Sequence, residues 1–99
     1  MADYTLTNKA VEDLTGIWEY STESWSESQA EKYYLLLVQT FRKLAISPGL
    51  GNKYKSIGDD IFGFKVGQHI IFYLSRLNED ILILRILHLR MDLNIKIDE

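Results

Sequence analysis

The most constraining feature of this sequence is a pair of apolar runs separated by a short polar segment. The runs are HIIFYL at residues 69–74 and ILILRIL at residues 81–87, and Asn78-Glu79-Asp80 lies between them. β-Branched and aromatic residues are abundant in both runs, as is typical of strands flanking a turn. The pattern therefore predicts a β-hairpin. Polar side chains return at residues 88–92, directly after the second strand, where functional surfaces often lie.

Alternation along this hairpin predicts two apolar faces, because residues i and i+2 share one face of a strand. The face expected to form the core holds Phe64, Val66, Ile70, Phe72, Leu74, Leu82, Leu84 and Ile86. The opposite face holds Lys65, His69, Ile71, Tyr73, Ile81, Ile83, Arg85 and Leu87. This second face is too apolar to be freely solvated, so a helical layer, a second copy of the chain or a separate partner protein should cover it.

Length and composition indicate one small domain over residues 1–99. The chain has 99 residues, of which 46% are hydrophobic, enough for one core. It has no cysteine and only two histidines, so we expect no metal and no cofactor. No apolar run approaches the roughly 20 residues that span a bilayer, and the first residues do not resemble a signal peptide. We expect a soluble cytoplasmic protein that does not bind membranes.

Charge is unevenly distributed along the chain. The net charge is −3, which argues against direct binding of nucleic acid. Residues 1–31 carry seven acids against Lys9 alone, whereas residues 32–58 carry five basic residues and no acid. The basic region is either a docking site for an acidic partner segment or a solvated helix end with its loop.

The residues before the hairpin predict a short strand and two helices. Residues 3–7 alternate like a strand, and apolar residues from 8 to 24 recur at helical spacing after a cap at Thr7 or Asn8. Gly16 inside this helix suggests close approach of another backbone. Ser26 and Gln29 have the spacing of a capping box, which starts a second helix that runs to about residue 46. The two tryptophans, Trp18 and Trp25, are interpreted as packing residues within this helical pair.

The predicted fold class is therefore α+β. Two helices separated by so few residues must form an antiparallel hairpin, and its apolar stripe is expected to lie across the core face of the sheet. Residues 47–60 contain the only proline and three glycines, so they are predicted to form a long loop. The expected order is β-α-α-β-β-β.

Several segments resemble the ParE toxins of the RelE/ParE superfamily. The resemblance is carried by Trp25, Gln29-Ala30, Tyr33, Leu44-Ala45, Pro48, Gly51, residues 64–67, HIIFY at 69–73, and ILRILH at 83–88 with Arg90-Met91-Asp92. It covers nearly the whole chain, and the β-α-α-β-β-β order agrees with the superfamily's fold. Family members often have arginine where this chain has Asn52-Lys53 and Gln68, which puts the strength of any toxicity in doubt.

The resemblance implies a type II toxin that inhibits DNA gyrase by protein contact, without enzymatic activity of its own. It also implies a ParD-like antitoxin whose C-terminal tail covers the helical hairpin and the semi-apolar sheet face. On this basis we expect the gyrase-inhibition surface to contain His88, Arg90, Met91 and Asp92. The antitoxin-binding residues are expected to be Tyr33, Leu37, Lys53, Lys55, Ile71, Tyr73, Ile83, Arg85 and Leu87.

Three alternatives remain open from the sequence. The chain is alternatively a ribosome-dependent messenger RNA endonuclease like the RelE branch, with His88 as its acid or base; however, no tyrosine follows Tyr73. Arg85 needs a carboxylate partner, either within the fold or from the antitoxin. Arg90 and Asp92 form either part of the toxicity surface or a structural C-terminal turn.

Overall fold

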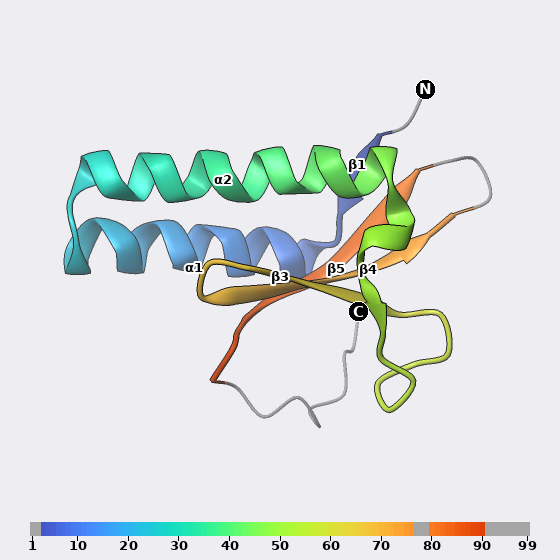
Figure 1. Ribbon diagram of the computed structural model, residues 1–99. Coiled ribbons are helices and arrows are strands. Elements are labelled where there is room, and N and C mark those ends of the chain that lie inside the picture. The colour runs from blue at the N-terminus through green and yellow to red at the C-terminus, as the bar shows by residue number, and fades with distance from the viewer. Residues whose placement is uncertain (1–2, 77–79, 91–99) are drawn as a thin grey trace.

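A helical hairpin lies against one face of a five-stranded sheet in the computed structural model, which describes residues 3–76 and 80–90 (Figure 1). The elements in chain order are β1 (Tyr4–Leu6), α1 (Asn8–Ser24), α2 (Glu27–Ile46), a 3-10 turn (Pro48–Leu50), β2 (Asn52–Lys53), β3 (Phe62–Val66), β4 (His69–Ser75) and β5 (Ile81–His88). The α+β class is confirmed. None of the helices in the described part of the chain is both long and apolar enough to cross a lipid bilayer.

Local capping determines where both helices begin. The Thr7 hydroxyl accepts a hydrogen bond from the Ala10 N–H at 3.1 Å, and the Ser26 hydroxyl accepts one from the Gln29 N–H at 3.1 Å. Each bond satisfies an N–H that has no partner within the helix. The predicted boundaries of both helices are therefore confirmed, and Thr7 rather than Asn8 is the first cap.

The two helices pack against each other partly through aromatic rings. Trp18 meets Tyr34 edge to face with ring centroids 6.0 Å apart, and Trp25 meets Tyr33 in the same way at 5.8 Å. Both tryptophans therefore pack within the helical pair as predicted, but each also leaves part of its ring accessible, since Trp18 lines one surface groove and Trp25 another. The expectation for Gly16 is wrong, because a Cβ built there would meet nothing within 4 Å.

The sheet has the strand order β1-β5-β4-β3-β2. β1 pairs in parallel with the first half of β5, and all other pairs are antiparallel. Sequence analysis missed β2, a two-residue strand whose Asn52 and Lys53 pair with Gly63 and Phe62 of β3. Strands this short carry too few residues for an alternation pattern to be detected.

For β4 and the first part of β5, the helices cover the sheet face opposite to the one predicted, whereas Phe64 and Val66 of β3 lie on the helix side as predicted. The core between helices and sheet contains Ile71, Tyr73, Ile81 and Ile83 together with Leu37, Phe41 and Leu44 of α2. A bulge in β5 also breaks the predicted alternation: Phe72 pairs with Arg85 while Tyr73 pairs with Ile83, so Leu84 is an extra residue. As a result Ile86 joins the helix-side core, whereas Leu84 does not.

The other sheet face forms a second, smaller core beneath the loop that follows β2. Buried Ile70, Phe72, Leu84 and Leu87 pack there against Tyr54, Ile57 and Ile61. The long loop is anchored to the sheet by the hydroxyl of Tyr73, which donates to the Pro48 carbonyl at 2.6 Å and accepts from the Gly51 N–H at 3.0 Å. Both sheet faces are thus covered largely by the chain itself.

Candidate functional site

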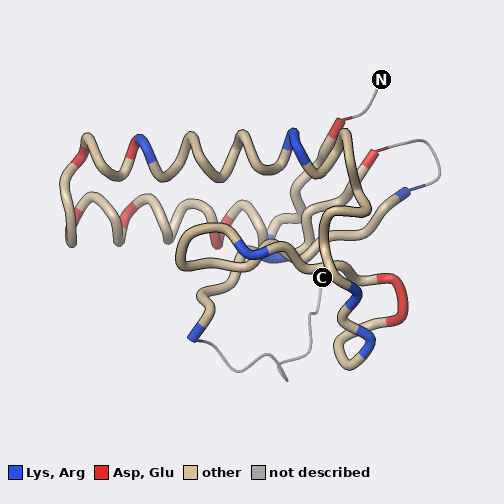
Figure 2. The backbone as a smooth tube through the Cα atoms, viewed as in Figure 1, with Lys and Arg blue, Asp and Glu red and all other residues tan. Residues whose placement is uncertain are grey.

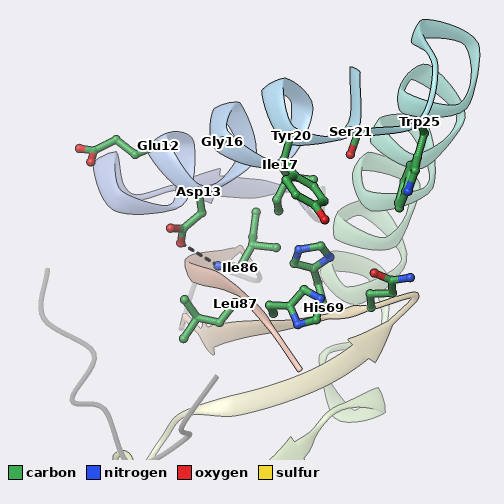
Figure 3. Close-up of a pocket in the computed structure, with 12 residues that line it drawn as sticks. Glu12, Asp13, Gly16, Ile17, Tyr20, Ser21, Trp25, His69, Ile86 and Leu87 are labelled. Atoms are coloured by element: carbon green, nitrogen blue, oxygen red, sulfur yellow. Dashed lines mark hydrogen bonds between the residues drawn. The ribbon is translucent and has the colours of Figure 1, made fainter. Parts of the chain in front are cut away.

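A cleft of about 360 Å³ opens between α1 and the end of β5 (Figure 3). Its wall on the helix side includes Gly16, Ile17 and Tyr20, and the sheet contributes Ile86, His69 and His88. Gly16 leaves room in this wall because it has no side chain. The cleft combines an apolar floor with ring nitrogens, carboxylates and a phenol, the composition of a small binding site.

Arg85 and Asp13 form an ion pair at one side of this cleft. Arg85 Nε lies 2.7 Å from Asp13 Oδ2, and a second guanidinium nitrogen lies 3.0 Å from Oδ1. The Ile86 N–H also donates to Asp13 Oδ2 at 3.0 Å, a bond drawn in Figure 3. Hydrogen bonding of the guanidinium to the Asp13 carboxylate raises the pKa of Arg85, an effect that partial burial opposes. The open alternative for Arg85 is therefore resolved in favour of a partner within the fold.

This carboxylate also completes the edge of β5. β1 pairs with β5 only as far as Ile83, after which the Thr7 hydroxyl donates to the Leu84 carbonyl at 2.8 Å. Asp13 then accepts the N–H of Ile86. Polar groups at an edge strand need partners, and the start of α1 supplies them where β1 has ended.

A column of three rings, those of Tyr33, His69 and His88, connects α2 to the end of β5. The Tyr33 hydroxyl lies 2.6 Å from His69 Nδ1 and accepts from the Gln68 N–H at 3.1 Å, while the Val66 carbonyl is farther away at 3.4 Å. A contact as short as 2.6 Å is typical of a hydroxyl donor. We therefore assign the Tyr33 proton to the bond with His69, whose neutral ring then carries its own proton on Nε2.

The His69 ring in turn packs edge to face against His88, with centroids 5.2 Å apart. Burial, and to a smaller extent the neighbouring His88, lowers the pKa of His69 to about 4 from an ordinary 6.5, although Asp13 opposes this shift. His69 is therefore neutral at physiological pH. Burial also raises the pKa of Tyr33, which keeps its hydroxyl protonated.

The turn before β4 is built to admit Tyr33. Gly67 has a φ of +56°, and a Cβ there would lie 2.6 Å from a ring carbon of Tyr33. Only glycine meets both requirements without strain. This turn brings Gln68 beside the end of β5, where the Leu89 N–H donates to the Gln68 carbonyl at 3.0 Å.

The residues predicted for gyrase inhibition lie at the exit of β5. His88 is half-buried and Arg90 is exposed, and the Arg90 N–H donates to His88 Nδ1 at 3.1 Å. Together with Tyr20, Trp25 and Gln68 they line a second hollow that adjoins the cleft. Met91 and Asp92 lie outside the described residues.

Four of the residues predicted to bind an antitoxin are inaccessible. Leu37, Ile71, Tyr73 and Ile83 each have 0% exposure, because the last three lie on the sheet face that the helices cover and Leu37 is the α2 residue that packs in the same core. Assigning them to a partner surface was wrong, since contact would require opening the core. Leu87 is also buried, in the second core.

The remaining predicted antitoxin residues retain some accessibility. Tyr33 is half-buried, Arg85 has a side chain 20% exposed and paired with Asp13, and Lys53 and Lys55 are exposed. The basic region does not form one patch, since Figure 2 shows its positions at the two ends of α2 and in the loop beyond. Lys53 Nζ lies 5.9 Å from the Phe62 ring centre, a cation–π contact within the fold.

A groove on the outer side of the helical hairpin was missed by sequence analysis. It measures about 550 Å³ and is lined by Val11, Leu14, Thr15, Trp18, Glu31, Tyr34 and Leu35. Val11 and Leu35 are each 49% exposed. The available signal was the run of six apolar residues at 33–38, because one helix face cannot bury six consecutive side chains.

The fold and cleft place the chain in a class of small α+β proteins with a helical hairpin on a sheet. A solved structure described as the chromosomal ParDE toxin–antitoxin system from P. aeruginosa has a similar fold, with a TM-score of 0.72, 20% sequence identity, and coverage of 89% of this chain and 95% of that one. Residues 4–93 match the model of the family described as the ParE toxin of the type II toxin–antitoxin system parDE.

Named relatives agree with this match. Toxin ParE1 of Caulobacter vibrioides is 33% identical over 92 residues, which is 93% of this chain and 94% of the relative. Toxin ParE of Escherichia coli is 33% identical over 93 residues, or 94% of this chain and 90% of the relative. The chain belongs to the ParE toxin family of type II toxin–antitoxin systems.

Proposed function

We propose that this protein inhibits DNA gyrase by direct protein contact and that a ParD-like antitoxin neutralises it. The observation that carries the proposal is the family match over residues 4–93, which extends through the end of β5. In this reading the chain performs no covalent chemistry. Its activity depends on a surface that gyrase contacts, which we place around His88 and Arg90, with Met91 and Asp92 as further candidates.

The geometry at the end of β5 supports this placement. Arg90 is exposed, and His88 is held by the ring of His69 on one side and by the Arg90 N–H on the other. Preordered side chains lose little entropy on association, which favours binding. Arginine and aromatic residues such as Trp25, which is 40% exposed beside this surface, are enriched among residues that dominate binding energy.

For the antitoxin we propose the outer groove of the helical hairpin in place of the buried sheet residues. Exposed Val11, Tyr34 and Leu35 line it together with Trp18, and an apolar groove of this kind accepts the apolar face of a helix. Lys53 and Lys55 remain candidates for contacts with acidic antitoxin residues, because both are exposed. The two proposed surfaces lie on different parts of the molecule.

The test is gyrase supercoiling of relaxed plasmid in the presence of the purified protein, with a check for cleaved DNA after detergent and protease. We expect loss of supercoiling that purified ParD-like antitoxin reverses. Full gyrase activity at high protein concentration would contradict the proposal. Topoisomerase IV relaxation assayed in parallel distinguishes gyrase from a related enzyme.

The endonuclease alternative has its own distinct outcome. Stabilising the charge of a cleaved phosphodiester requires several cations, whereas the residues lining the cleft include Glu12 and Asp13, and Arg90 is the only cation lining either hollow at the end of β5 in the described part of the chain. Cleavage of ribosome-bound messenger RNA with gyrase left unaffected would favour it over our proposal. His88→Ala would then be the first variant to assay.

A further inference from the structure

The hollow at the end of β5 has an unusual set of polar side chains. It is lined by Tyr20, Trp25, Gly67, Gln68, His88, Leu89 and Arg90. Every polar side chain in this set can donate a hydrogen bond, and none is a carboxylate. The acids Glu12 and Asp13 line only the neighbouring cleft, and Asp13 is neutralised by Arg85.

The hydrogen-bond network leaves Nε2 of His88 as the ring nitrogen that can donate. Because the Arg90 N–H donates to His88 Nδ1, the neutral ring carries its proton on Nε2. Within residues 3–76 and 80–90, Nε2 has no hydrogen-bond partner. All buried side-chain nitrogens in these residues do have partners, so Nε2 is not buried and is accessible to solvent. His88 and Arg90 both line the hollow, so a ring N–H and a guanidinium are among its possible donors.

Two further residues fix the position of this donor. Tyr33 holds His69 through the 2.6 Å hydrogen bond, and the His69 ring packs edge to face against the His88 ring. Tyr33 and His69 are positioning residues, since neither lines the hollow. His88 is thus preorganised for an acceptor, because its ring need not be ordered when the acceptor arrives.

We propose that this hollow binds a single carboxylate, presented as an Asp or Glu side chain by the protein that contacts the end of β5. The identity of that partner as gyrase rests on the proposed function, whereas the carboxylate specificity does not. Arg90 supplies the charge, and His88 and the Gln68 amide supply further donors. Guanidinium groups bind carboxylates through paired, charge-assisted hydrogen bonds.

A carboxylate suits the site better than a phosphate of a nucleic acid backbone. One cation lines the hollow, and the nearby part of α1 carries Glu19 and Glu23. A chain of phosphates would be repelled by these acids and by the net charge of −3. One carboxylate carries a single charge, so these acids repel it less than they repel a chain of phosphates, and Arg90 offsets that charge.

The test is an NMR titration of the ¹⁵N-labelled full chain with sodium acetate, in which sodium chloride is replaced so that ionic strength is constant. We expect saturable shifts of the Trp25 indole, the Gln68 side-chain amide and the Arg90 Nε–H, with a dissociation constant in about the millimolar range typical of so small a ligand. Arg90→Gln should weaken acetate binding about tenfold, because a charge-assisted bond is lost. The matched control Arg42→Gln, at an exposed position of α2, should leave acetate binding unchanged.

Three outcomes would overturn the proposal: no saturable acetate shift, equal weakening by both arginine variants, or saturation by inorganic phosphate but not by acetate. His88→Phe should also weaken acetate binding several-fold. If His88→Phe fails to fold, Arg90→Gln still tests the proposal. Gyrase is absent from this experiment. Acetate binding without gyrase inhibition would therefore support the carboxylate site and contradict gyrase as the target.

Discussion

Asp13 of α1 and Arg85 of β5 are joined by two hydrogen bonds, of 2.7 and 3.0 Å, although 72 positions separate them in the chain. The same carboxylate accepts the Ile86 N–H at 3.0 Å. Side-chain exposures of 20% for Arg85 and 15% for Asp13 mean that this cluster is largely withdrawn from solvent. Removing one member would leave the others partly buried without partners. The resulting loss in free energy of unfolding exceeds the net stabilisation that the ion pair provides.

Asp13→Ala should lower the free energy of unfolding by about 2–3 kcal/mol, because it leaves the Arg85 guanidinium and the Ile86 N–H without their hydrogen-bond acceptor. Urea unfolding followed by circular dichroism measures this change. Glu12→Ala, at the exposed neighbouring position, is the control and should change stability by less than about 0.5 kcal/mol. Equal effects of the two substitutions would show that the pair contributes nothing specific.

His69 should make stability depend on pH. Its pKa is about 4 in the folded protein and near 6.5 when unfolded, so between these values the unfolded state binds the extra proton. The stabilisation that comes from a neutral His69 is therefore fully present above pH 6.5, and it is lost as the pH falls toward 4. Urea unfolding should show a loss of about 2 kcal/mol over this window, with allowance for solvent screening, that is absent in His69→Gln. An identical pH slope in both proteins would exclude His69 as its source.

Tyr33→Phe should raise the pKa of His69 toward its ordinary value. The hydroxyl donates to Nδ1 and so stabilises the neutral ring, and its loss removes this preference. An NMR titration of the histidine ring signals measures the change. Tyr34→Phe is the matched control, because Tyr34 lies on the outer groove and contacts Trp18 instead. A His69 pKa that stays the same in Tyr33→Phe would mean that the hydroxyl does not donate to this ring.

Leu35→Asp should weaken antitoxin binding by at least about tenfold, because it places a charge in the apolar groove of the helical hairpin. Folding should be preserved, since Leu35 is 49% exposed. Ile46→Asp, at an exposed position at the end of the same helix, serves as the control. Calorimetric titration with the antitoxin gives both dissociation constants, and similar values for the two variants would place the antitoxin elsewhere.

Arg90→Ala should raise the toxin concentration needed for half-inhibition of gyrase by about tenfold, if a charged contact of about 1.4 kcal/mol is lost. Arg76→Ala removes an exposed arginine beyond the end of β4 and should have no effect. Supercoiling assays with matched protein concentrations compare the two. Undiminished inhibition by Arg90→Ala would remove the end of β5 from the proposed gyrase surface.

The helices and strands of this protein were largely predictable because their signals are local. The hydroxyls of Thr7 and Ser26 lie three residues before the amides they cap, so both helix starts could be read from the chain. The strand pair at 69–75 and 81–88 followed from its β-branched composition. Family membership was recognisable for a similar reason, since it depends on the order and spacing of residues.

The candidate site was only partly predictable. Residues at the end of β5 were identified from the return of polar side chains, but the hollow around His88 and Arg90 also requires Tyr20 and Trp25 from α1 and its end. The ring column from Tyr33 to His69 joins residues 36 positions apart. No periodic pattern along the chain indicates which of several aromatic rings will meet in space.

What the amino-acid sequence determined by itself was the set of elements, because capping, alternation and turn chemistry act between residues close in the chain. What only the tertiary structure decided was which apolar sheet face received the helices, because both faces are apolar enough to be buried. The bulge at Leu84 decided where the alternation changes phase, and Asp13 decided the partner of Arg85. These outcomes depend on packing between distant segments, whose relative energies no local pattern records.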